Sequence, residues 1–292
     1  MTIKKAVFPI AGLGTRFLPA SKAVPKEMLQ VVDKPLLQYA TEEAVAAGIT
    51  ELIFVTRPNK ELIARHFKRN EELENTLLKK GREDLLACIR DIVPGHVTCS
   101  FIWHPNSLGL GHAVLCAQNM IAGEPFAVIL PDDLIVNGGR NALQQIADVH
   151  TRYGGSVIAL ERVRHTQTEH YGIVDIDPVA PRVGRLKDIM EKPAAGLAPS
   201  NLAVVGRYIL TPRIFELLKE TKAGIGGEIQ LTDAISDLLK YESVHGYEIE
   251  GRRYDCGHKL GLWQANVELG LEHPEIGENV YGYLQNILST QN

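Results

Sequence analysis

The sequence predicts an α/β fold, in which helices cover both faces of a mostly parallel central sheet and a smaller second lobe follows. Two observations predict it. Strand-like and helix-like stretches alternate through roughly residue 160. The strand-like stretches are continuous apolar runs, which are typical of parallel strands buried on both faces. Beyond that point the pattern loosens into shorter strands and helices. We therefore expect one globular domain over residues 1–292, with a change of character near residue 160.

The predicted elements follow from apolar runs, from helical periodicity and from the proline and glycine residues that begin or end them. Strands are expected at 5–10, 50–56, 96–103, 125–133 and 155–163, then at 171–176 and 201–210. Helices are expected at 34–49, within the charged stretch 59–90, and at 111–121, 141–154, 212–222 and 231–241. Pro35 suits the first turn of its helix and Gly48 its end. Gly109 and Gly111 open the helix at 111–121.

Composition excludes several classes of protein. The chain has 292 residues, of which 45% are hydrophobic and 23% are charged, so it is neither disordered nor fibrous. The formal net charge is −4, which argues against a broad basic surface for nucleic acid. No stretch approaches the roughly 18 apolar residues of a membrane span. The N-terminus lacks a signal-peptide pattern. We expect a cytoplasmic protein without nucleic-acid or membrane partners.

The four cysteines are Cys88, Cys99, Cys116 and Cys256. None forms a C-x-x-C pair, and none lies in a His/Cys cluster with zinc spacing. We expect buried, inert thiols in a reducing compartment.

The stretch AGLGTRFLPASKAVPKEML follows the first strand and combines bare backbone with positive charge. Ligands of open parallel sheets lie beyond the carboxyl ends of the strands. Gly12 and Gly14 let backbone N–H groups approach an anion, while Arg16 and Lys26 add cations. The dinucleotide fingerprint fails here because Phe17 stands at its third glycine, and no P-loop is present. The stretch predicts a phosphate-binding turn of another kind, or a tight turn with solvated cations.

AGLGTRFLP and PKEML resemble the signature of the sugar-1-phosphate nucleotidyltransferases, which is G-x-G-T-R followed by P-K. Further matching stretches run in family order from residue 6 to about residue 270: VDKPLLQYATEEAVAAGITELIFVT, LGLGHAVLCA, AVILPDDLI, EKP, APSNLAVVGRYIL, GEIQLTDAI and DCGHKLG. The resemblance implies a Rossmann-like, glycosyltransferase-A-like sheet. Residues 1–160 would form its nucleotide-binding part, and residues 161–292 its sugar-binding lobe and C-terminal helices.

The resemblance also implies a reaction, in which UTP and glucose 1-phosphate give UDP-glucose and diphosphate with the help of Mg²⁺. The attacking phosphate oxygen is already ionised, so neither a general base nor a covalent nucleophile is needed. Catalysis then depends on alignment and on neutralising charge at the α-phosphorus. Family members are commonly oligomeric, which implies a homo-oligomer, either a dimer or a tetramer.

The implied catalytic residues are Arg16, Lys26 and Asp132. Thr15 and Arg16 would hold the departing diphosphate, and Lys26 would stabilise charge at the α-phosphate. The nucleotide-binding residues implied are Ala11, Gly12, Gly14, Thr15, Glu27, His104, Gly109 and Gly111. Glu27 would reach the uracil edge and Gly109 would let the base lie against backbone.

Asp132 and Asp233 are the implied metal ligands, since Mg²⁺ is commonly bound through one or two carboxylates. The implied sugar-phosphate residues are Gly172, Glu191, Lys192 and Val204. Glu191 would take sugar hydroxyls and Lys192 the sugar phosphate. Each of these residues also has an ordinary alternative as a turn, helix-start or surface residue.

The match departs from the family at one place. Trp103 and His104 stand where the family usually has Arg-Gln, and the Gln contacts uracil. The sequence therefore leaves selectivity for the base open between UTP and dTTP or another triphosphate. A non-catalytic paralogue is a second alternative, which the retained Thr15, Arg16, Lys26 and Asp132 argue against. A nicotinamide oxidoreductase is excluded by the missing third glycine and by the lack of an acidic residue ending the second strand.

Overall fold

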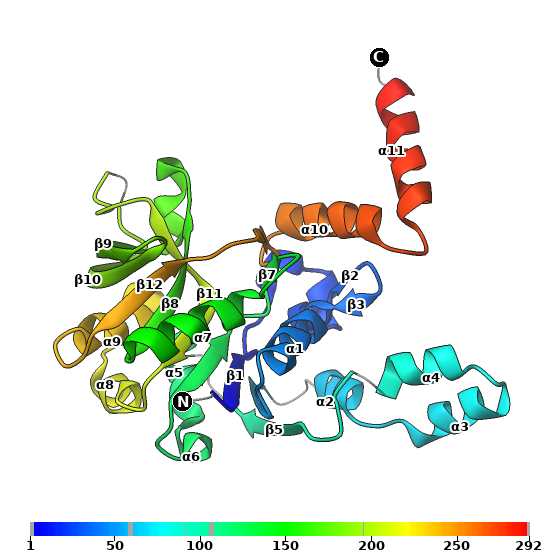
Figure 1. Cartoon of the computed structure of the whole chain (residues 1–292), viewed down its shortest axis with the longest axis horizontal. Coiled ribbons are helices and arrows are strands. Elements are labelled where there is room, and N and C mark those ends of the chain that lie inside the picture. The colour runs from blue at the N-terminus through cyan, green and yellow to red at the C-terminus, as the bar shows by residue number, and fades with distance from the viewer. Residues whose placement is uncertain (1–2, 58–60, 91, 105–107, 195, 291–292) are drawn as a thin grey trace.

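The computed structural model describes residues 3–57, 61–90, 92–104, 108–194 and 196–290. Within these residues the largest sheet has nine strands in the order β5-β4-β1-β6-β11-β8-β12-β10-β9 (Figure 1). The strands span Thr98–Trp103 (β5), Glu51–Thr56 (β4), Lys5–Pro9 (β1), Phe126–Ile129 (β6), Leu202–Leu210 (β11), Ser156–Arg162 (β8), Val244–Glu248 (β12), Val183–Glu191 (β10) and Gly172–Ala180 (β9). The α/β class predicted from the sequence is confirmed.

The sheet is parallel in one half and mixed in the other. Strands β5, β4, β1 and β6 pair in parallel, as predicted for the first part of the chain. Strand β11 then enters between β6 and β8 and is antiparallel to both. From there outward the pairing is antiparallel except between β12 and β8. The hairpin between β9 and β10 explains the antiparallel pairing of these two strands, because a hairpin connection, unlike a crossover helix, produces antiparallel pairing.

Helices cover both faces of this sheet. On one face lie α1 (Leu36–Ala46) and α7 (Ala142–Tyr153); on the other lie α5 (Leu110–Cys116), α8 (Ile214–Glu220) and α9 (Leu231–Leu238). Consecutive strand residues point to opposite faces, so Val7 packs into the cluster under α5 and Phe8 into the cluster under α1. Because both faces are covered, the strands are continuous apolar runs.

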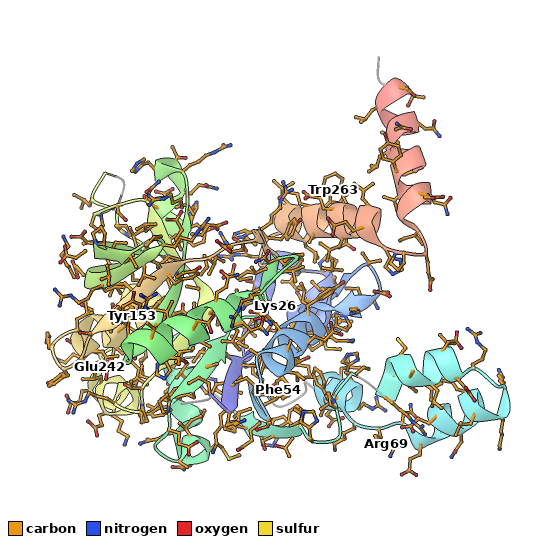
Figure 2. The ribbon with its side chains drawn as sticks, viewed as in Figure 1. Lys26, Phe54, Arg69, Tyr153, Glu242 and Trp263 are labelled. Carbon is orange, nitrogen blue, oxygen red and sulfur yellow. The ribbon has the colours of Figure 1, made fainter. Side chains whose placement is uncertain are left out.

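Other helices lie at the edges of the molecule. The charged stretch forms α2 (Glu61–Phe67), α3 (Glu71–Lys79) and α4 (Glu83–Arg90), while α6 (Gln118–Ile121) continues the line of α5 after a break. The resemblance implied C-terminal helices without giving their bounds; they are α10 (Lys259–Glu272) and α11 (Gly277–Thr290), and α11 projects away from the body (Figure 1). Figure 2 labels Trp263 on α10, where it is 61% exposed. Among the described residues, no helix has both the length and the apolar character needed to span a membrane.

A small ribbon brings the C-terminal part of the chain to the end of β6. Strand β7 (Asp133–Val136) pairs with β13 (Arg252–Asp255) in antiparallel register. Leu134 and Tyr254 from this ribbon pack with Leu36 and Ala265 in a third apolar cluster. The remaining short elements are β2 (Gln30–Val31), β3 (Lys34–Pro35) and the 3₁₀ helices η1 (Thr15–Phe17), η2 (Ala20–Lys22), η3 (Lys26–Met28), η4 (His165–His170) and η5 (Ile225–Gly227).

Candidate functional site

The turn after β1 wraps around the side chain of Lys26. Gly14 has φ of 66°, a left-handed conformation, and a Cβ there would lie 3.1 Å from Lys26 Cβ. A Cβ on Gly12 would lie 3.6 Å from Lys26 Cε. Ser21 Oγ donates a hydrogen bond of 2.7 Å to the Gly14 carbonyl and closes the turn. The two glycines therefore allow the lysine to lie against bare backbone, while Arg16 stays exposed on η1.

Lys26 is paired with Asp132, which lies just beyond the end of β6. Lys26 Nζ donates to Asp132 Oδ2 over 2.5 Å, and both side chains are largely buried. Burial opposes the Lys26 charge, but the carboxylates of Asp132 and Glu27 outweigh it and raise its pKa above the usual 10.5. Burial likewise opposes the charge of Asp132, but the charge and hydrogen bond of Lys26 lower its pKa. Both groups are therefore charged at neutral pH.

Two acidic side chains and one guanidinium surround Gly257, directly after β13. A Cβ on this glycine would lie 3.0 Å from Asp255 Oδ1, 3.3 Å from Asp132 Oδ2 and 3.8 Å from an Arg16 nitrogen. The Cys256 N–H donates to the Asp132 carbonyl over 2.7 Å, which holds this segment in place. Sequence reasoning gave Asp255 and Gly257 no role, although DCGHKLG was among the stretches that resemble the family.

Both carboxylate oxygens of Asp133 accept hydrogen bonds from within the protein. Its Oδ1 accepts from Arg253 over 2.5 Å and its Oδ2 accepts from the Gly206 N–H over 2.8 Å. Burial raises the pKa of Asp133, against the opposing charge of Arg253. Arg253 also donates to Glu161 Oε2 over 2.5 Å and to the Tyr171 hydroxyl over 3.0 Å. Arg253, Glu161 and Tyr171, together with Asp255, line a pocket of about 640 Å³.

A buried ion pair between Arg207 and Glu43 holds the backbone at the end of β6. Arg207 of β11 is 1% exposed and donates to both carboxylate oxygens of Glu43 on α1, at 2.7 to 3.0 Å. Its Nη1 donates to the Leu130 carbonyl over 3.1 Å, and its Nη2, which also bonds Glu43, donates to the Asp133 carbonyl over 2.8 Å. Arg207 therefore ties the backbone on both sides of Asp132 to α1. Sequence reasoning missed this pair.

Three of the four residues predicted to bind the sugar phosphate come together at the end of β10. Gly172 lies opposite Glu191 in the β9–β10 register, and Lys192 Nζ lies 3.1 Å from Glu191 Oε1. Thr232 Oγ1 donates to Glu191 Oε2 over 2.8 Å. Val204 is buried in β11.

Asp233 belongs to the Glu191 group. Burial raises its pKa, and the charges of Glu191 and Asp237 raise it further. The charges that lower the pKa of Asp132 are those of Lys26 and Arg207. Asp255 is a carboxylate placed beside Asp132, and the metal role expected for Asp233 stays a prediction.

Gly109 and Gly111 are explained by packing against the segment that precedes α9. Gly109 has φ of 97°, and a Cβ on it would lie 2.9 Å from the Ile229 carbonyl oxygen. A Cβ on Gly111 would lie 2.8 Å from the same oxygen, which accepts the Gly111 N–H over 2.9 Å. The contact with the nucleotide expected for both glycines stays a prediction.

The side chain expected at the base edge is buried. His104 is 1% exposed, and its Nε2 lies 2.5 Å from His112 Nδ1 on α5. Burial, then His112 and Arg57, lower the pKa of His104, so the ring is neutral at pH 7. Contact with uracil stays a prediction for His104 and for Glu27, which is also buried. Ala11 is buried as well, and Thr15 is exposed.

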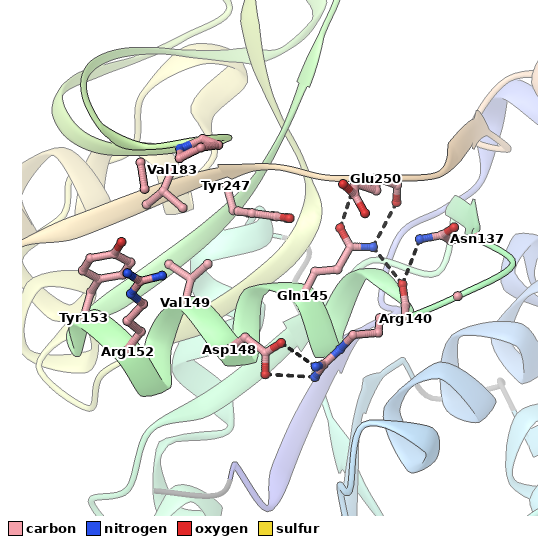
Figure 3. Close-up of a pocket in the computed structure, with 13 residues that line it drawn as sticks. Asn137, Arg140, Gln145, Asp148, Val149, Arg152, Tyr153, Val183, Tyr247 and Glu250 are labelled. Carbon is pink, nitrogen blue, oxygen red and sulfur yellow. Dashed lines mark hydrogen bonds and ion pairs between the residues drawn. The ribbon is translucent and has the colours of Figure 1, made fainter.

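A separate pocket of about 510 Å³ lies along α7 (Figure 3). Gln145 spans it, donating to the carbonyls of Arg140 and Glu250 at 2.8 and 3.0 Å. Arg140 pairs with Asp148 on its rim. None of the residues predicted for the site lines this pocket, so we do not assign the nucleotide to it.

Comparisons with known proteins match the chain to one family over nearly its whole length. The sequence model of the nucleotidyl transferase family matches residues 5–271. The UTP–glucose-1-phosphate uridylyltransferase of Escherichia coli K12 is 46% identical over 97% of this chain and 95% of its own length. That of Bacillus subtilis strain 168 is 44% identical over 99% and 98%. A UTP-bound UGPase from Acinetobacter baumannii matches with a TM-score of 0.89 at 46% identity, covering 98% of this chain and 99% of its own. A UDP-glucose pyrophosphorylase complexed with UDP-glucose matches with a TM-score of 0.85 at 42% identity, covering 93% and 100%.

Proposed function

The chain belongs to the nucleotidyl transferase family, and we propose that its Lys26–Asp132 site transfers the uridylyl group of UTP to glucose 1-phosphate. The products are UDP-glucose and diphosphate. Relatives named for this activity share 43–46% of their residues over almost the whole chain. The observation that carries the proposal is the Lys26 ammonium, held against a glycine turn at the carboxyl end of β1.

The reaction requires the protein to position the two substrates and to supply positive charge. The nucleophile is a phosphate oxygen that is ionised at neutral pH, so no side chain has to remove a proton. Lys26 lies against bare backbone at Gly12 and Gly14, where a phosphate can approach both the ammonium and peptide N–H groups. The raised pKa of Lys26 keeps the ammonium protonated at neutral pH. Arg16 is exposed on η1, within reach of the phosphates that leave as diphosphate.

The side chains around Gly257 fit a magnesium ion. Asp255 Oδ1 and Asp132 Oδ2 would lie 3.0 and 3.3 Å from a Cβ on Gly257, so two carboxylate oxygens border the same space. Carboxylate oxygens are the ligands that Mg²⁺ prefers, one or two at a time together with phosphate oxygens. We assign Asp132 and Asp255 to this ion. When bound, it would neutralise charge on the phosphates of the triphosphate.

The acceptor sugar phosphate is assigned to the end of β10. Lys192 supplies a cation for the phosphate of glucose 1-phosphate, and Glu191 supplies an acceptor for sugar hydroxyls. The Thr232 hydroxyl orients the Glu191 carboxylate. Gly172, opposite Glu191, leaves room beside that carboxylate, since a Cβ there would lie 3.4 Å from Glu191 Oε2. Val204 is assigned to the same site, where its backbone would contact the sugar ring.

A triphosphate panel tests the function directly. Purified protein with Mg²⁺ and glucose 1-phosphate is given UTP, dTTP, CTP, ATP or GTP, and released diphosphate is measured. We expect UTP to give the highest kcat/KM. Pocket discrimination against the single methyl group of thymine is about 1–3 kcal/mol, so dTTP should be the runner-up. A preference for dTTP would establish the sister activity. UDP-glucose binding without diphosphate release from any triphosphate would establish a non-catalytic protein.

A further inference from the structure

Three metal-ligating side chains meet away from the Lys26–Asp132 pair. They are His104, His112 and Cys116, called the His–His–Cys cluster below. One ligand atom from each lies within 4.8 Å of the others. His104 Nε2 is 2.5 Å from His112 Nδ1, and Cys116 Sγ is 3.9 Å from the same nitrogen. The spacing of cysteines along the chain did not predict this cluster, because His104 comes from a different element.

Two secondary-structure elements fix the cluster. His112 and Cys116 are four residues apart on α5, so their side chains share one face of the helix. His104 follows β5, and its backbone N–H donates to the Thr56 carbonyl over 2.7 Å, beside the last paired residues of β4 and β5. The cluster therefore joins the edge of the sheet to α5. The positions of the three side chains are therefore set by the sheet edge and by the helix.

The unliganded cluster crowds two buried ring nitrogens. His104 is 1% exposed, and its Nε2 lies 2.5 Å from His112 Nδ1. Burying such polar groups costs free energy unless they are well paired. Only a single proton can sit between two ring nitrogens 2.5 Å apart. A packing role alone would be served more cheaply by apolar side chains.

A transition metal suits these donors. Zn²⁺ binds imidazole nitrogen at about 2.0–2.1 Å and thiolate sulfur at about 2.3 Å in a tetrahedron. That geometry separates two nitrogens by about 3.3 Å and a nitrogen from a sulfur by about 3.6 Å. The observed 2.5 and 3.9 Å lie on either side of these values, so small ring rotations reach both. Mg²⁺ prefers oxygen ligands and is excluded from such a set.

We propose that the His–His–Cys cluster binds one borderline-soft divalent ion, with Zn²⁺ as the ion of choice. The three side chains leave a fourth coordination position for water. His112 directly follows Gly111, which bonds the Ile229 carbonyl, so the ion would sit beside a turn that belongs to the predicted nucleotide site. This ion is distinct from the magnesium assigned to Asp132 and Asp255.

Cobalt titration tests the proposal. The full-length protein is freed of metal with a chelator and titrated with Co²⁺, whose visible d–d bands report geometry and whose near-ultraviolet thiolate charge-transfer band reports a cysteine ligand. We expect one equivalent of Co²⁺ per chain, a charge-transfer band, and displacement by Zn²⁺ but not by excess Mg²⁺. Cys116→Ser should abolish the charge-transfer band. His104→Gln should weaken Co²⁺ affinity by at least about tenfold, the lower scale for disturbing a metal's ligand environment.

Cys88→Ser is the matched control, since Cys88 is an exposed free thiol on α4. It should leave the band and the affinity unchanged. Circular dichroism establishes that each variant is folded before titration. The proposal is overturned if the wild-type protein shows no charge-transfer band, if the band survives Cys116→Ser, or if it disappears in Cys88→Ser.

Discussion

Lys26 Nζ and Asp132 Oδ2 lie 2.5 Å apart although 106 residues separate them in the chain. The parallel pairing of β1 and β6 brings their carboxyl ends together, and each residue lies in the segment beyond one of those ends. A cation and a carboxylate thus meet where an open α/β sheet binds its ligands. This pair is the physical centre of the proposed site.

Replacing Lys26 with methionine should lower turnover by at least about 100-fold, because one preformed charge donor to the transition state is worth that much. Diphosphate release at saturating UTP and glucose 1-phosphate measures it. Lys22→Met is the control, since Lys22 is an exposed lysine on η2 and should retain wild-type turnover. Near-normal turnover of Lys26→Met would remove Lys26 from its assigned role.

The pKa values of the pair predict its pH dependence. The Asp132 pKa is lowered, so its stabilising contribution is present above 3.8 and is lost as pH falls through the folded value. The Lys26 pKa is raised, so its contribution is present below 10.5 and is lost as pH rises through its folded value. The contribution of the pair is therefore flat between 3.8 and 10.5.

Asp132→Asn should lower the Lys26 pKa. Burial is the largest influence on Lys26 and lowers its pKa, and Asp132 is the strongest opposing charge. Without that charge we expect the Lys26 pKa to fall below the wild-type value. NMR titration of ¹³Cε-labelled lysine measures it. An unchanged Lys26 pKa in Asp132→Asn would contradict the coupling described here.

Magnesium titration separates the three candidate carboxylates. Asp132→Asn and Asp255→Asn should each raise the Mg²⁺ concentration needed for half-maximal turnover by about tenfold or more, because each removes a proposed oxygen ligand. Asp233→Asn should leave this concentration unchanged and instead alter the KM for glucose 1-phosphate, since Asp233 lies with Glu191. A shifted Mg²⁺ requirement in Asp233→Asn alone would restore the assignment made from the sequence.

Much of the fold could be predicted because its strands are apolar on both faces. Val7 and Phe8 are adjacent and equally buried, one under α5 and the other under α1, so β1 reads as an uninterrupted run. The parallel half of the sheet follows from such runs alternating with helices. The position of β11 did not follow, because it pairs antiparallel with β6 and β8, which are distant from it in the sequence, and local periodicity does not reveal such pairings.

The site was predictable where its residues are local and not where it is assembled from distant segments. Gly12, Gly14, Arg16 and Lys26 lie within one short stretch, and the structure folds that stretch around Lys26. Asp255 reaches the site only through the β7–β13 ribbon. No local spacing relates a residue of that ribbon to the end of β6.

Gly111→Ala should destabilise the protein by about 1–3 kcal/mol, the cost of inserting a methyl group into a packed site. The added Cβ would lie 2.8 Å from the Ile229 carbonyl oxygen and 2.9 Å from Leu218 Cδ2. Urea unfolding measures the change. Gly282→Ala, in the exposed helix α11 with open space at the same atom, should instead stabilise slightly. Normal stability with a raised KM for UTP in Gly111→Ala would favour a ligand role for this glycine.

The last prediction concerns the Glu43–Arg207 pair, whose burial distinguishes it from surface pairs. Arg207→Met leaves the Glu43 carboxylate buried beside α7, where its Oε1 still accepts from the Leu143 N–H over 3.0 Å. Breaking a buried pair in this way costs about 3–5 kcal/mol. The variant should lose that much unfolding free energy in urea. It should also lose turnover at temperatures where it is folded, since Arg207 holds the backbone around Asp132.

The double variant Glu43→Gln/Arg207→Met shows whether the loss comes from the pair itself. Removing both charges leaves no isolated ion, so the double variant should be more stable than the sum of the single effects predicts, by about 0.5–3 kcal/mol. Arg140→Met, which breaks the exposed pair with Asp148, should change stability by no more than about 0.5 kcal/mol. Additive effects of Glu43→Gln and Arg207→Met would mean that the two side chains act independently, Arg207 through the carbonyls on either side of Asp132 and Glu43 through the Leu143 N–H of α7.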